Sequence, residues 1–234
     1  MKPIWFFFHV PKTGGQTIRD YLTAELGRDI GYLHLGRWDR SAPLGHDDVA
    51  AMGEAKLADL SAIGGHPLTR SFAEFFPARP IREFTIVREP AAQIVSHYNF
   101  IASIRRARDQ EIPTFEQWLE ERAPNSQCGA LSRGLGIGRT RLSELLYALD
   151  RMWFVGCTER LDEALPLLFA AMALPPRLPT RSNVGGEGAI DSLVELTPDL
   201  ADRLRRENPL DVILHAACER LHDRGVARLL SATA

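Results

Sequence analysis

Four short apolar runs stand out along the chain, each followed by a turn-forming segment. They span residues 4–10, 61–66, 83–87 and 152–156. The first run is almost wholly apolar, which is typical of a strand buried on both faces inside a parallel sheet. The second run is the weakest of the four and ends at a Gly-Gly-His turn. The pattern therefore predicts four strands.

Apolar residues recur at helical spacing between and after these runs. We predict helices over residues 18–26, 47–60, 90–105, 113–122, 139–149, 161–173, 197–207 and 209–223. Asp47 or Asp48 is the expected N-cap of the second helix, and Pro90 suits a first helical turn. Residues 27–45 read as an irregular connection. Strands that alternate with helices predict an α/β, three-layer, P-loop-like fold with a central, mostly parallel sheet flanked by helices.

Composition narrows the class of protein. A chain of 234 residues with 45% hydrophobic content can bury a full core, so we expect residues 1–234 to form a single domain. A formal net charge of -2 gives no general attraction to nucleic acid or anionic membranes. The three cysteines are widely separated and favour a reducing compartment. No run approaches the ~18 apolar residues of a membrane span. We expect a cytoplasmic protein; its oligomeric state stays open.

The segment after the first strand has the composition of a phosphate-binding turn. Residues 11–17 read Pro-Lys-Thr-Gly-Gly-Gln-Thr and lead into a predicted helix, whose N–H groups and dipole favour an anion. In the nucleotide motif G-x-x-x-x-G-K-[ST] the lysine follows the glycines, whereas Lys12 precedes Gly14 and Gly15. The turn is thus predicted to hold phosphate without being an ordinary nucleotide P-loop.

Right-handed crossovers would place the loops that follow the strands along one edge of the sheet. That edge would gather the polar residues Lys12, His66, Arg88, Thr158 and Arg181. Arg88 begins a helical stretch in which Ser96 lies two turns further on, and a guanidinium fork with a hydroxyl suits a phosphate monoester. The alternative is that Arg88 pairs with Glu89 or Asp109 and that Ser96 only packs.

These motifs resemble those of sulfotransferases that use 3'-phosphoadenosine-5'-phosphosulfate (PAPS). The resemblance is carried by the turn at residues 11–17, the sequence Ile-Val-Arg-Glu-Pro at 86–90 with Ser96, and three further patches at 125–127, 154–161 and 208–211. It is closest to the carbohydrate 2-O-sulfotransferase-like branch and its bacterial relatives. It implies a saccharide or glycan-precursor hydroxyl as the acceptor.

The resemblance also implies a role for individual residues. The cofactor's 5'-phosphosulfate would contact Lys12, Thr13, Gly14, Gly15, Gln16 and Thr17. Arg88 and Ser96 would hold its 3'-phosphate, with Arg181 in a late loop that closes over that end. Thr158 would lie near the adenine, although a plain strand cap is an equal alternative. No metal is required for this chemistry.

A base must still take the proton of the acceptor hydroxyl. His66 resembles in position the histidine that does so in the 2-O branch, and a neutral imidazole suits the task. The alternative is a turn histidine that caps a helix starting at Pro67. Burial is the expected fate of His9, and His97 should point away from Ser96. The fallback candidates are His34, His46, Asp47, Asp48 and Glu54.

Two other classes of protein compete with this reading. A P-loop small-molecule kinase or nucleoside-triphosphate hydrolase would need a lysine after the glycines and an aspartate that ends a later strand. Here the lysine comes first and the strand at 83–87 ends in Arg88. A binding module that has kept the scaffold without catalysis is the second competitor, and replacing His66 would leave such a module unaffected.

Overall fold

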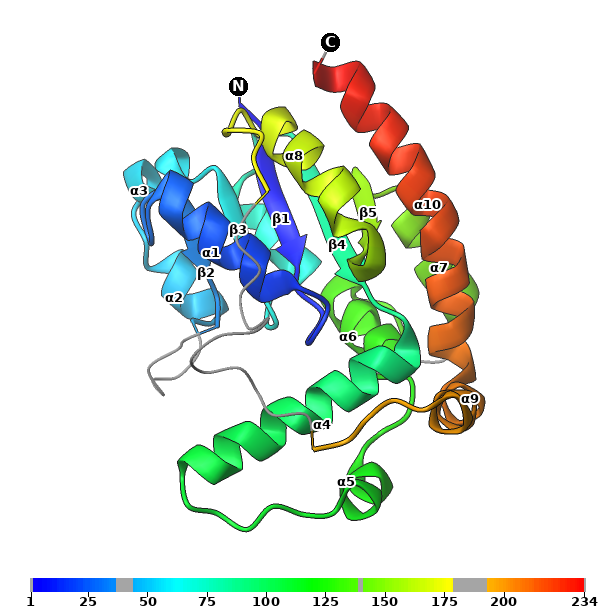
Figure 1. Ribbon diagram of the computed structural model, residues 1–234. Helices are drawn as coiled ribbons and strands as arrows, with labels where there is room; N and C mark the ends of the chain where they lie inside the picture. The colour runs from blue at the N-terminus through cyan, green and yellow to red at the C-terminus, as the bar shows by residue number, and fades with distance from the viewer. Residues whose placement is uncertain (1, 37–43, 139–140, 179–192, 234) are drawn as a thin grey trace.

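A five-stranded, wholly parallel sheet forms the centre of the molecule. The computed structural model describes residues 2–36, 44–138, 141–178 and 193–233. The strands are β1 (Ile4–Phe8), β2 (Tyr32–His34), β3 (Ala62–Gly65), β4 (Ile81–Val87) and β5 (Phe154–Cys157), in the order β2-β3-β1-β4-β5 (Figure 1). The predicted α/β fold with a central parallel sheet flanked by helices is confirmed.

The central strand β1 explains why the sheet is sandwiched between two helical layers. Its five residues are all buried, and successive side chains alternate between the two faces. Trp5 and Phe7 enter one apolar cluster, whereas Ile4, Phe6 and Phe8 enter the other. Fully burying one such side chain contributes about 1.5–3 kcal/mol, so β1 is a major source of cohesion for both layers.

The two faces of the sheet are covered by different helices. On the Trp5 face lie α1 (Gly15–Leu26) and α8 (Leu161–Ala171). The other face is covered by α2 (His46–Ala50), α3 (Glu54–Asp59), the 3-10 helix η1 (Arg70–Phe75), α6 (Ser126–Leu135) and α7 (Leu142–Asp150). The long helix α10 (Pro209–Thr233) runs beside β5 (Figure 1).

A separate helical layer lies below the carboxyl ends of the strands. It consists of α4 (Pro90–Ala107), α5 (Phe115–Glu121) and α9 (Pro198–Glu207), seen at the bottom of Figure 1. Its own apolar cluster includes Ile94, Val95 and Leu204, with Trp118 packed against it. The short 3-10 helix η2 (Thr158–Arg160) follows β5 at this same edge. The carboxyl edge of the sheet therefore faces α4 across the loops that follow the strands.

Several predicted elements differ from those observed. The helix predicted over 47–60 is split into α2 and α3, because Gly53 takes the N-cap position of α3. The N-cap of α2 is Gly45, whose N–H donates to Asp48 at 2.7 Å. The strand β2 lies in the stretch predicted to be irregular, and it is short enough to give no pattern of its own.

Further differences concern the second half of the chain. The helix α6 was not predicted, because its apolar residues are separated by Gly, Ser and Gln. The helix α7 starts at Leu142, and α10 continues ten residues beyond the predicted end, to Thr233. No helix starts at Pro67; the nearest is η1. Within the described residues, no helix is long and apolar enough to cross a membrane.

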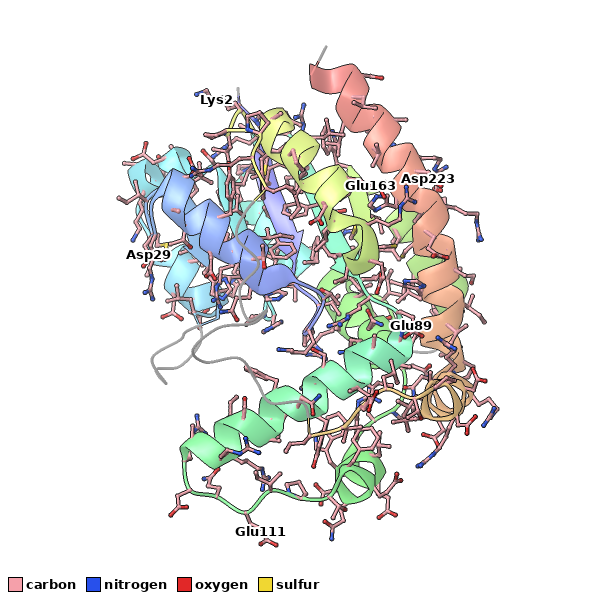
Figure 2. The ribbon with its side chains drawn as sticks, in the orientation of Figure 1. Lys2, Asp29, Glu89, Glu111, Glu163 and Asp223 are labelled. Carbon is pink, nitrogen blue, oxygen red and sulfur yellow. The ribbon has the colours of Figure 1, made fainter. Side chains whose placement is uncertain are left out.

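The strand order defines a crevice at the carboxyl edge. The chain leaves β1 through α1 toward β2 on one side, whereas β4 leads through α4 toward β5 on the other. Ligands of open α/β sheets bind where the connections diverge in this way. Figure 2 labels Glu89 at this edge and Lys2 at the opposite, amino edge. The loops after β1 and β4 therefore frame the candidate site.

Candidate functional site

The loop after β1 is shaped by two glycines at the start of α1. Gly14 is the N-cap residue with φ at 84°, a left-handed conformation that costs glycine little. A Cβ at Gly14 would lie 2.8 Å from Leu161 Cδ1, and a Cβ at Gly15 would lie 2.1 Å from the imidazole of His9. No side chain of the described chain caps α1. The loop thus presents main-chain N–H groups where an anion would be stabilised.

Two threonine hydroxyls fix this loop to the sheet. The fully buried Thr13 donates its hydroxyl hydrogen to the Val10 carbonyl at 2.9 Å. The Thr158 hydroxyl lies 2.9 Å from the Thr13 carbonyl and 3.0 Å from the Val87 carbonyl. A hydroxyl has only one hydrogen to donate. Because both hydroxyls already donate to main-chain carbonyls, Thr13 and Thr158 stabilise the loop in this structure. The strand-cap alternative for Thr158 matches these contacts, and contact of Thr158 with an adenine stays a prediction.

The remaining residues of the predicted turn lie at the first turn of α1. Gln16 is half-buried, and Thr17 is buried with its N–H bonded to the Gly14 carbonyl at 3.1 Å. Both residues were predicted in the turn before a helix over residues 18–26, whereas α1 begins three residues earlier, at Gly15. Their contact with a phosphate group stays a prediction.

Lys12 is a half-buried cation held against an aromatic ring. Its ammonium lies 4.0 Å from the centre of the Phe100 ring, an arrangement that is electrostatically attractive. Burial, and then the charge of Arg88, lower the pKa of Lys12 to about 8. Within the described chain, Lys12 forms no ion pair with a carboxylate. An incoming anion would therefore restore a strongly favourable charge balance.

Arg88 is positioned by its main chain and points toward the loop after β1. The buried side-chain amide of Gln127 accepts the Arg88 N–H at 3.0 Å and donates to the Arg88 carbonyl at 2.8 Å. The Arg88 guanidinium donates to the Lys12 carbonyl at 3.3 Å. Its pKa is lowered by burial. The alternative, an ion pair of Arg88 with Glu89 or Asp109, is absent from the described contacts, although the charges of Glu159 and Glu89 partly oppose the effect of burial on the pKa of Arg88.

Gln127 is itself fixed by two helix starts that cap each other. The buried Asp211 carboxylate of α10 accepts the N–H groups of Gln127 and Cys128, at 3.1 and 2.8 Å. In return, the Asn125 side chain accepts the N–H groups of Leu210 and Asp211, at 2.9 and 3.2 Å. The sequence patches 125–127 and 208–211, far apart in the chain, thus form one support behind Arg88. The role of Gln127 was not predicted.

Ser96 lies on the same face of α4 as the ring that contacts Lys12. It lies four residues before Phe100, so both residues occupy the same face of α4. Because Phe100 contacts the Lys12 ammonium, this face of α4 is turned toward the loop after β1. The half-buried Ser96 hydroxyl forms no hydrogen bond with the described residues. It is placed to serve a ligand between α4 and the loop.

His97 takes a different direction, as the sequence predicted. Its ring lies edge-on to Trp118, with the ring centres 5.4 Å apart, and burial lowers its pKa to about 4. Its Nδ1 is buried without a hydrogen-bond partner in the described structure. His97 thus belongs to the packing between α4 and α5.

His66, directly after β3, has the geometry of an oriented neutral imidazole. Its Nδ1 lies 2.8 Å from the His9 carbonyl, and only a protonated Nδ1 can donate to a carbonyl. Burial lowers the pKa of His66, although the hydrogen bond to His9 partly opposes this. The neutral tautomer with the hydrogen on Nδ1 leaves the Nε2 lone pair to accept a proton. The ring is enclosed enough for burial to lower its pKa, yet His66 keeps surface exposed to solvent, and it makes no helix cap.

A second imidazole supports the first. The ring of His9 stacks on that of His66, with centres 4.2 Å apart, and its other neighbour is Phe7 at 5.2 Å. Burial is the main reason that the pKa of His9 lies well below its usual value, followed by the charge of His66. His9 directly follows β1, and its Nδ1 is buried as predicted, but the hydrogen bond expected with that burial is absent among the described residues. Its role as a platform for His66 was not predicted.

The other predicted candidates lie elsewhere. His34 bonds the Tyr32 hydroxyl at 3.1 Å, and burial lowers its pKa to about 4. The His46 ring contacts the carboxylate of Glu74 on η1. Asp48 is engaged by the N–H of Gly45. Arg181 lies outside the described residues.

Two cations meet at this edge, where the nearby carboxylates of Glu89 and Glu159 contact Arg205 and His215. Lys12 and Arg88 are close enough for the charge of Arg88 to lower the pKa of Lys12. The ring of His66 stacks on His9, and the charges of His66 and Lys12 both lower the pKa of His9. The described residues contain no group of three His, Cys, Asp or Glu side chains that could hold a metal ion. Chemically, the arrangement suits a polyanionic ligand and the removal of a proton by a neutral base.

Comparison with known proteins yields a structural neighbour and no sequence relative. No family model matches the chain, and no curated protein matches it. A crystal structure described as a sulfotransferase from Alicyclobacillus acidocaldarius is similar to it over 95% of this chain and 96% of the other. The TM-score is 0.47 and the sequence identity is 13%.

Proposed function

We propose that this protein is a sulfotransferase that moves a sulfuryl group from PAPS to an acceptor hydroxyl. The observation that carries the proposal is the convergence of Lys12 and Arg88 at the carboxyl edge, where the Arg88 guanidinium donates to the Lys12 carbonyl. Because the group that links the two residues is a neutral carbonyl, neither positive charge is cancelled by this contact, and both can interact with an anionic ligand. The sequence resemblance set out above supplies the identity of that ligand.

The donor would span the crevice between the two strand-end loops. The N–H groups of Thr13 to Thr17 and the Lys12 ammonium would bind its 5'-phosphosulfate. Because the Thr13 hydroxyl is committed to Val10, Thr13 would act through its main chain. Arg88 and Ser96 would bind the 3'-phosphate as a fork and a hydroxyl donor. Thr158 and Arg181 complete the predicted set, Thr158 through the loop that it fixes.

The transfer step is an in-line displacement at sulfur. His66 Nε2 takes the acceptor hydroxyl proton while the acceptor oxygen forms its bond to sulfur. The bond between sulfur and the phosphate oxygen breaks, and the electron pair remains on adenosine 3',5'-bisphosphate. Lys12 stabilises the charge that develops on this phosphate oxygen, and one such contact in other enzymes contributes about 10²–10³ in rate.

The acceptor that we propose is a saccharide hydroxyl, on the basis of the similarity to the 2-O-sulfotransferase-like branch. We propose that residues 27–60, which precede His66 in the sequence, and residues 104–138, which follow most of α4, shape the acceptor site. The acceptor that we favour is a saccharide precursor in the cytoplasm. Transfer of labelled sulfate from PAPS to a panel of saccharides, lipid-linked sugars and small alcohols would identify the acceptor.

A ligand-binding experiment tests the donor class directly. We expect adenosine 3',5'-bisphosphate to raise the melting temperature without added metal, by about 2.7 kcal/mol of stability at 100 times its Kd. ATP with Mg²⁺ should give no comparable shift. A shift with Mg-ATP alone would contradict the proposal and favour the kinase alternative. An equal bisphosphate shift with no turnover on any acceptor would favour a binding module.

The pH dependence of kcat/KM tests the two proton-bearing groups. The profile should be bell-shaped, because kcat/KM reports the free enzyme's essential base and acid. Activity should fall in acid as His66 gains a proton, at a pKa below the usual histidine value. It should fall in alkali as Lys12 loses its proton, near its pKa of about 8. Lys12→Arg should move the alkaline limb upward, whereas a limb that stays in place would contradict the role of Lys12.

A further inference from the structure

A second cationic cavity lies at the opposite edge of the sheet, away from the site described above. It has a volume of about 400 Å³ and is lined by the apolar residues Ala73, Ile81 and Trp153 and the charged residues Arg70, Glu83, Arg151 and Arg228. Ile81 begins β4 and Trp153 precedes β5, so the cavity adjoins the amino ends of these strands. Its volume falls within the range of small-molecule sites.

The carboxylate in this cavity is already neutralised. Glu83 accepts two hydrogen bonds from the Arg70 guanidinium, at 2.7 and 2.6 Å. This bidentate pair has no net charge and leaves Arg151 and Arg228 to set the charge of the cavity. The lining therefore carries a net charge of two positive units, from three arginines and one glutamate.

The two remaining arginines have no carboxylate partner among the described residues. Arg228 donates through NH1 to the carbonyls of Met152 and Trp153, both at 2.9 Å. Of its five N–H groups, Nε and NH2 therefore remain for a ligand. The exposed Arg151 contacts Tyr147, with a long hydrogen bond of 3.5 Å to its hydroxyl and its guanidinium 5.7 Å from the ring centre, and it forms no ion pair with a described carboxylate.

A third arginine adds to the positive potential around Trp153. The Arg82 guanidinium lies against the adjoining indole rings of Trp5 and Trp153, 5.2 and 4.9 Å from their centres. Arg82 forms no ion pair with a carboxylate of the described residues. Trp153 therefore has one guanidinium over its ring and another on its carbonyl. This concentration of like charge is unfavourable unless an anion compensates it.

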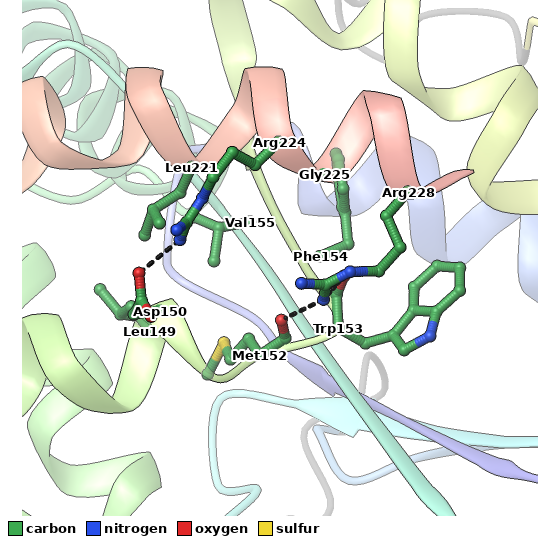
Figure 3. A pocket seen from close by; sticks show the side chains of 10 residues that line it. All are labelled: Leu149, Asp150, Met152, Trp153, Phe154, Val155, Leu221, Arg224, Gly225 and Arg228. Atoms are coloured by element: carbon green, nitrogen blue, oxygen red, sulfur yellow. Dashed lines mark hydrogen bonds and ion pairs between the residues drawn. The ribbon is translucent and has the colours of Figure 1, made fainter. Parts of the chain in front are cut away.

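A second, much smaller cavity lies under α10 and shares Arg228 and Trp153 with the larger cavity. This smaller cavity measures about 10 Å³, about the least that one water needs. Figure 3 shows Arg224 paired with Asp150 and Arg228 bonded to the Met152 carbonyl across it. The charge of Arg224 is thus balanced by Asp150, and this pair links α10 to α7. Arg228 bonds only neutral carbonyls among the described residues, so its charge is not balanced at the border of the larger cavity.

We propose that the cavity at Trp153, with Arg151 and Arg228, is a binding site for a small organic phosphate. Two guanidiniums without carboxylate partners match a phosphate monoester dianion better than a monoanion. The apolar wall of Ala73, Ile81 and Trp153 would receive the organic part. The site lies at the other edge of the sheet from Lys12 and Arg88 and does not depend on the proposed sulfuryl transfer.

Binding of phenyl phosphate, measured by calorimetry, tests this site. The double variant Lys12→Ala/Arg88→Ala is used to remove competition from the carboxyl edge, because adenosine 3',5'-bisphosphate is itself an organic phosphate and could occupy the cavity. We expect phenyl phosphate to bind with one-to-one stoichiometry, more tightly than inorganic phosphate, phenyl sulfate or phenol. Absence of binding at millimolar phenyl phosphate would overturn the proposal, and so would equal affinity for phenol.

Variants of the exposed arginine localise the site. Arg151→Gln should weaken phenyl phosphate binding by about tenfold, because it removes a charged hydrogen-bond donor. Arg141→Gln is the matched control, because Arg141 is an exposed arginine at the other end of the same helix. Equal losses in both variants would indicate general charge attraction and overturn the assignment.

The anchored arginine needs a separate check. Arg228→Gln should also weaken binding, and its melting temperature without ligand reports any damage to α10. Arg151→Lys keeps the charge but loses the fork, so it should fall between wild type and Arg151→Gln. Unchanged binding in folded Arg151→Gln/Arg228→Gln would place the ligand elsewhere and refute the proposal.

Discussion

The strand β4 has arginines near both ends, in opposite electrostatic situations. At its amino end, Arg70 and Glu83 form a bidentate pair that cancels both charges. At its carboxyl end, Arg88 bonds the neutral carbonyl of Lys12. The nearby Glu89 is engaged by Arg205 at 3.0 Å. An arginine anchored by carbonyls keeps its charge for a ligand, whereas one paired with a carboxylate contributes to the fold.

This difference predicts that the carboxyl edge governs function and that the Arg70–Glu83 pair governs local structure. The largest expected effect is that of Lys12→Ala. Turnover should fall by about 10²–10³, the range seen when a group that stabilises developing charge is removed. Bisphosphate binding should remain detectable by calorimetry. Turnover within a few-fold of wild type would show that Lys12 does not contact the reacting centre.

The two arginines near β4 allow a direct test of the comparison. Arg88→Ala should weaken adenosine 3',5'-bisphosphate binding by about 10–100-fold, the value of a charged hydrogen-bonded group. Arg70→Ala should leave this affinity unchanged and cost about 1 kcal/mol of stability, because its pair with Glu83 is partly exposed. Calorimetry and denaturant unfolding of both variants separate the two effects. Wild-type affinity in Arg88→Ala would refute the assignment of the 3'-phosphate site.

The parts of this site that follow a strand were predictable from the sequence. A continuous apolar run, a glycine turn and a helical period locate Lys12 and Arg88 after parallel strands, and topology then brings them to one edge. The position of His66 after β3 follows in the same way. These inferences depend on local patterns and on the handedness of crossovers.

The supporting contacts were not predictable, because they join distant segments through side-chain geometry. Gln127 reaches Arg88 across 39 positions, and Asp211 reaches Gln127 across 84. The stacking of His9 on His66 spans 57 positions and depends on the space left at Gly15. No periodic pattern encodes such a pairing. The helix α6 was likewise not predicted, because its apolar residues are interrupted by Gly, Ser and Gln and show no clear helical period.

The support behind Arg88 provides the third prediction. Asp211→Ala should destabilise the protein by about 1–2 kcal/mol, because two buried N–H groups at the start of α6 lose their acceptor. It should also weaken bisphosphate binding, since Gln127 holds Arg88. Asp223→Ala removes an exposed carboxylate on the same helix and should change stability by less than about 1 kcal/mol. Equal destabilisation in both variants would contradict the proposed support.

The smallest expected effect concerns acid stability. The pKa of His34 and that of His97 are each lowered to about 4, mainly by burial. Below the usual histidine pKa of about 6.5 the unfolded chain binds more protons than the folded one, so stability rises with pH. The stability is present above about pH 6.5 and is lost as the pH falls toward about 4. His97→Phe should flatten this acid slope in a plot of melting temperature against pH, because the ring packs on Trp118 without a described hydrogen bond at Nδ1. An unchanged slope would show that His97 is protonated in the folded protein at mildly acidic pH.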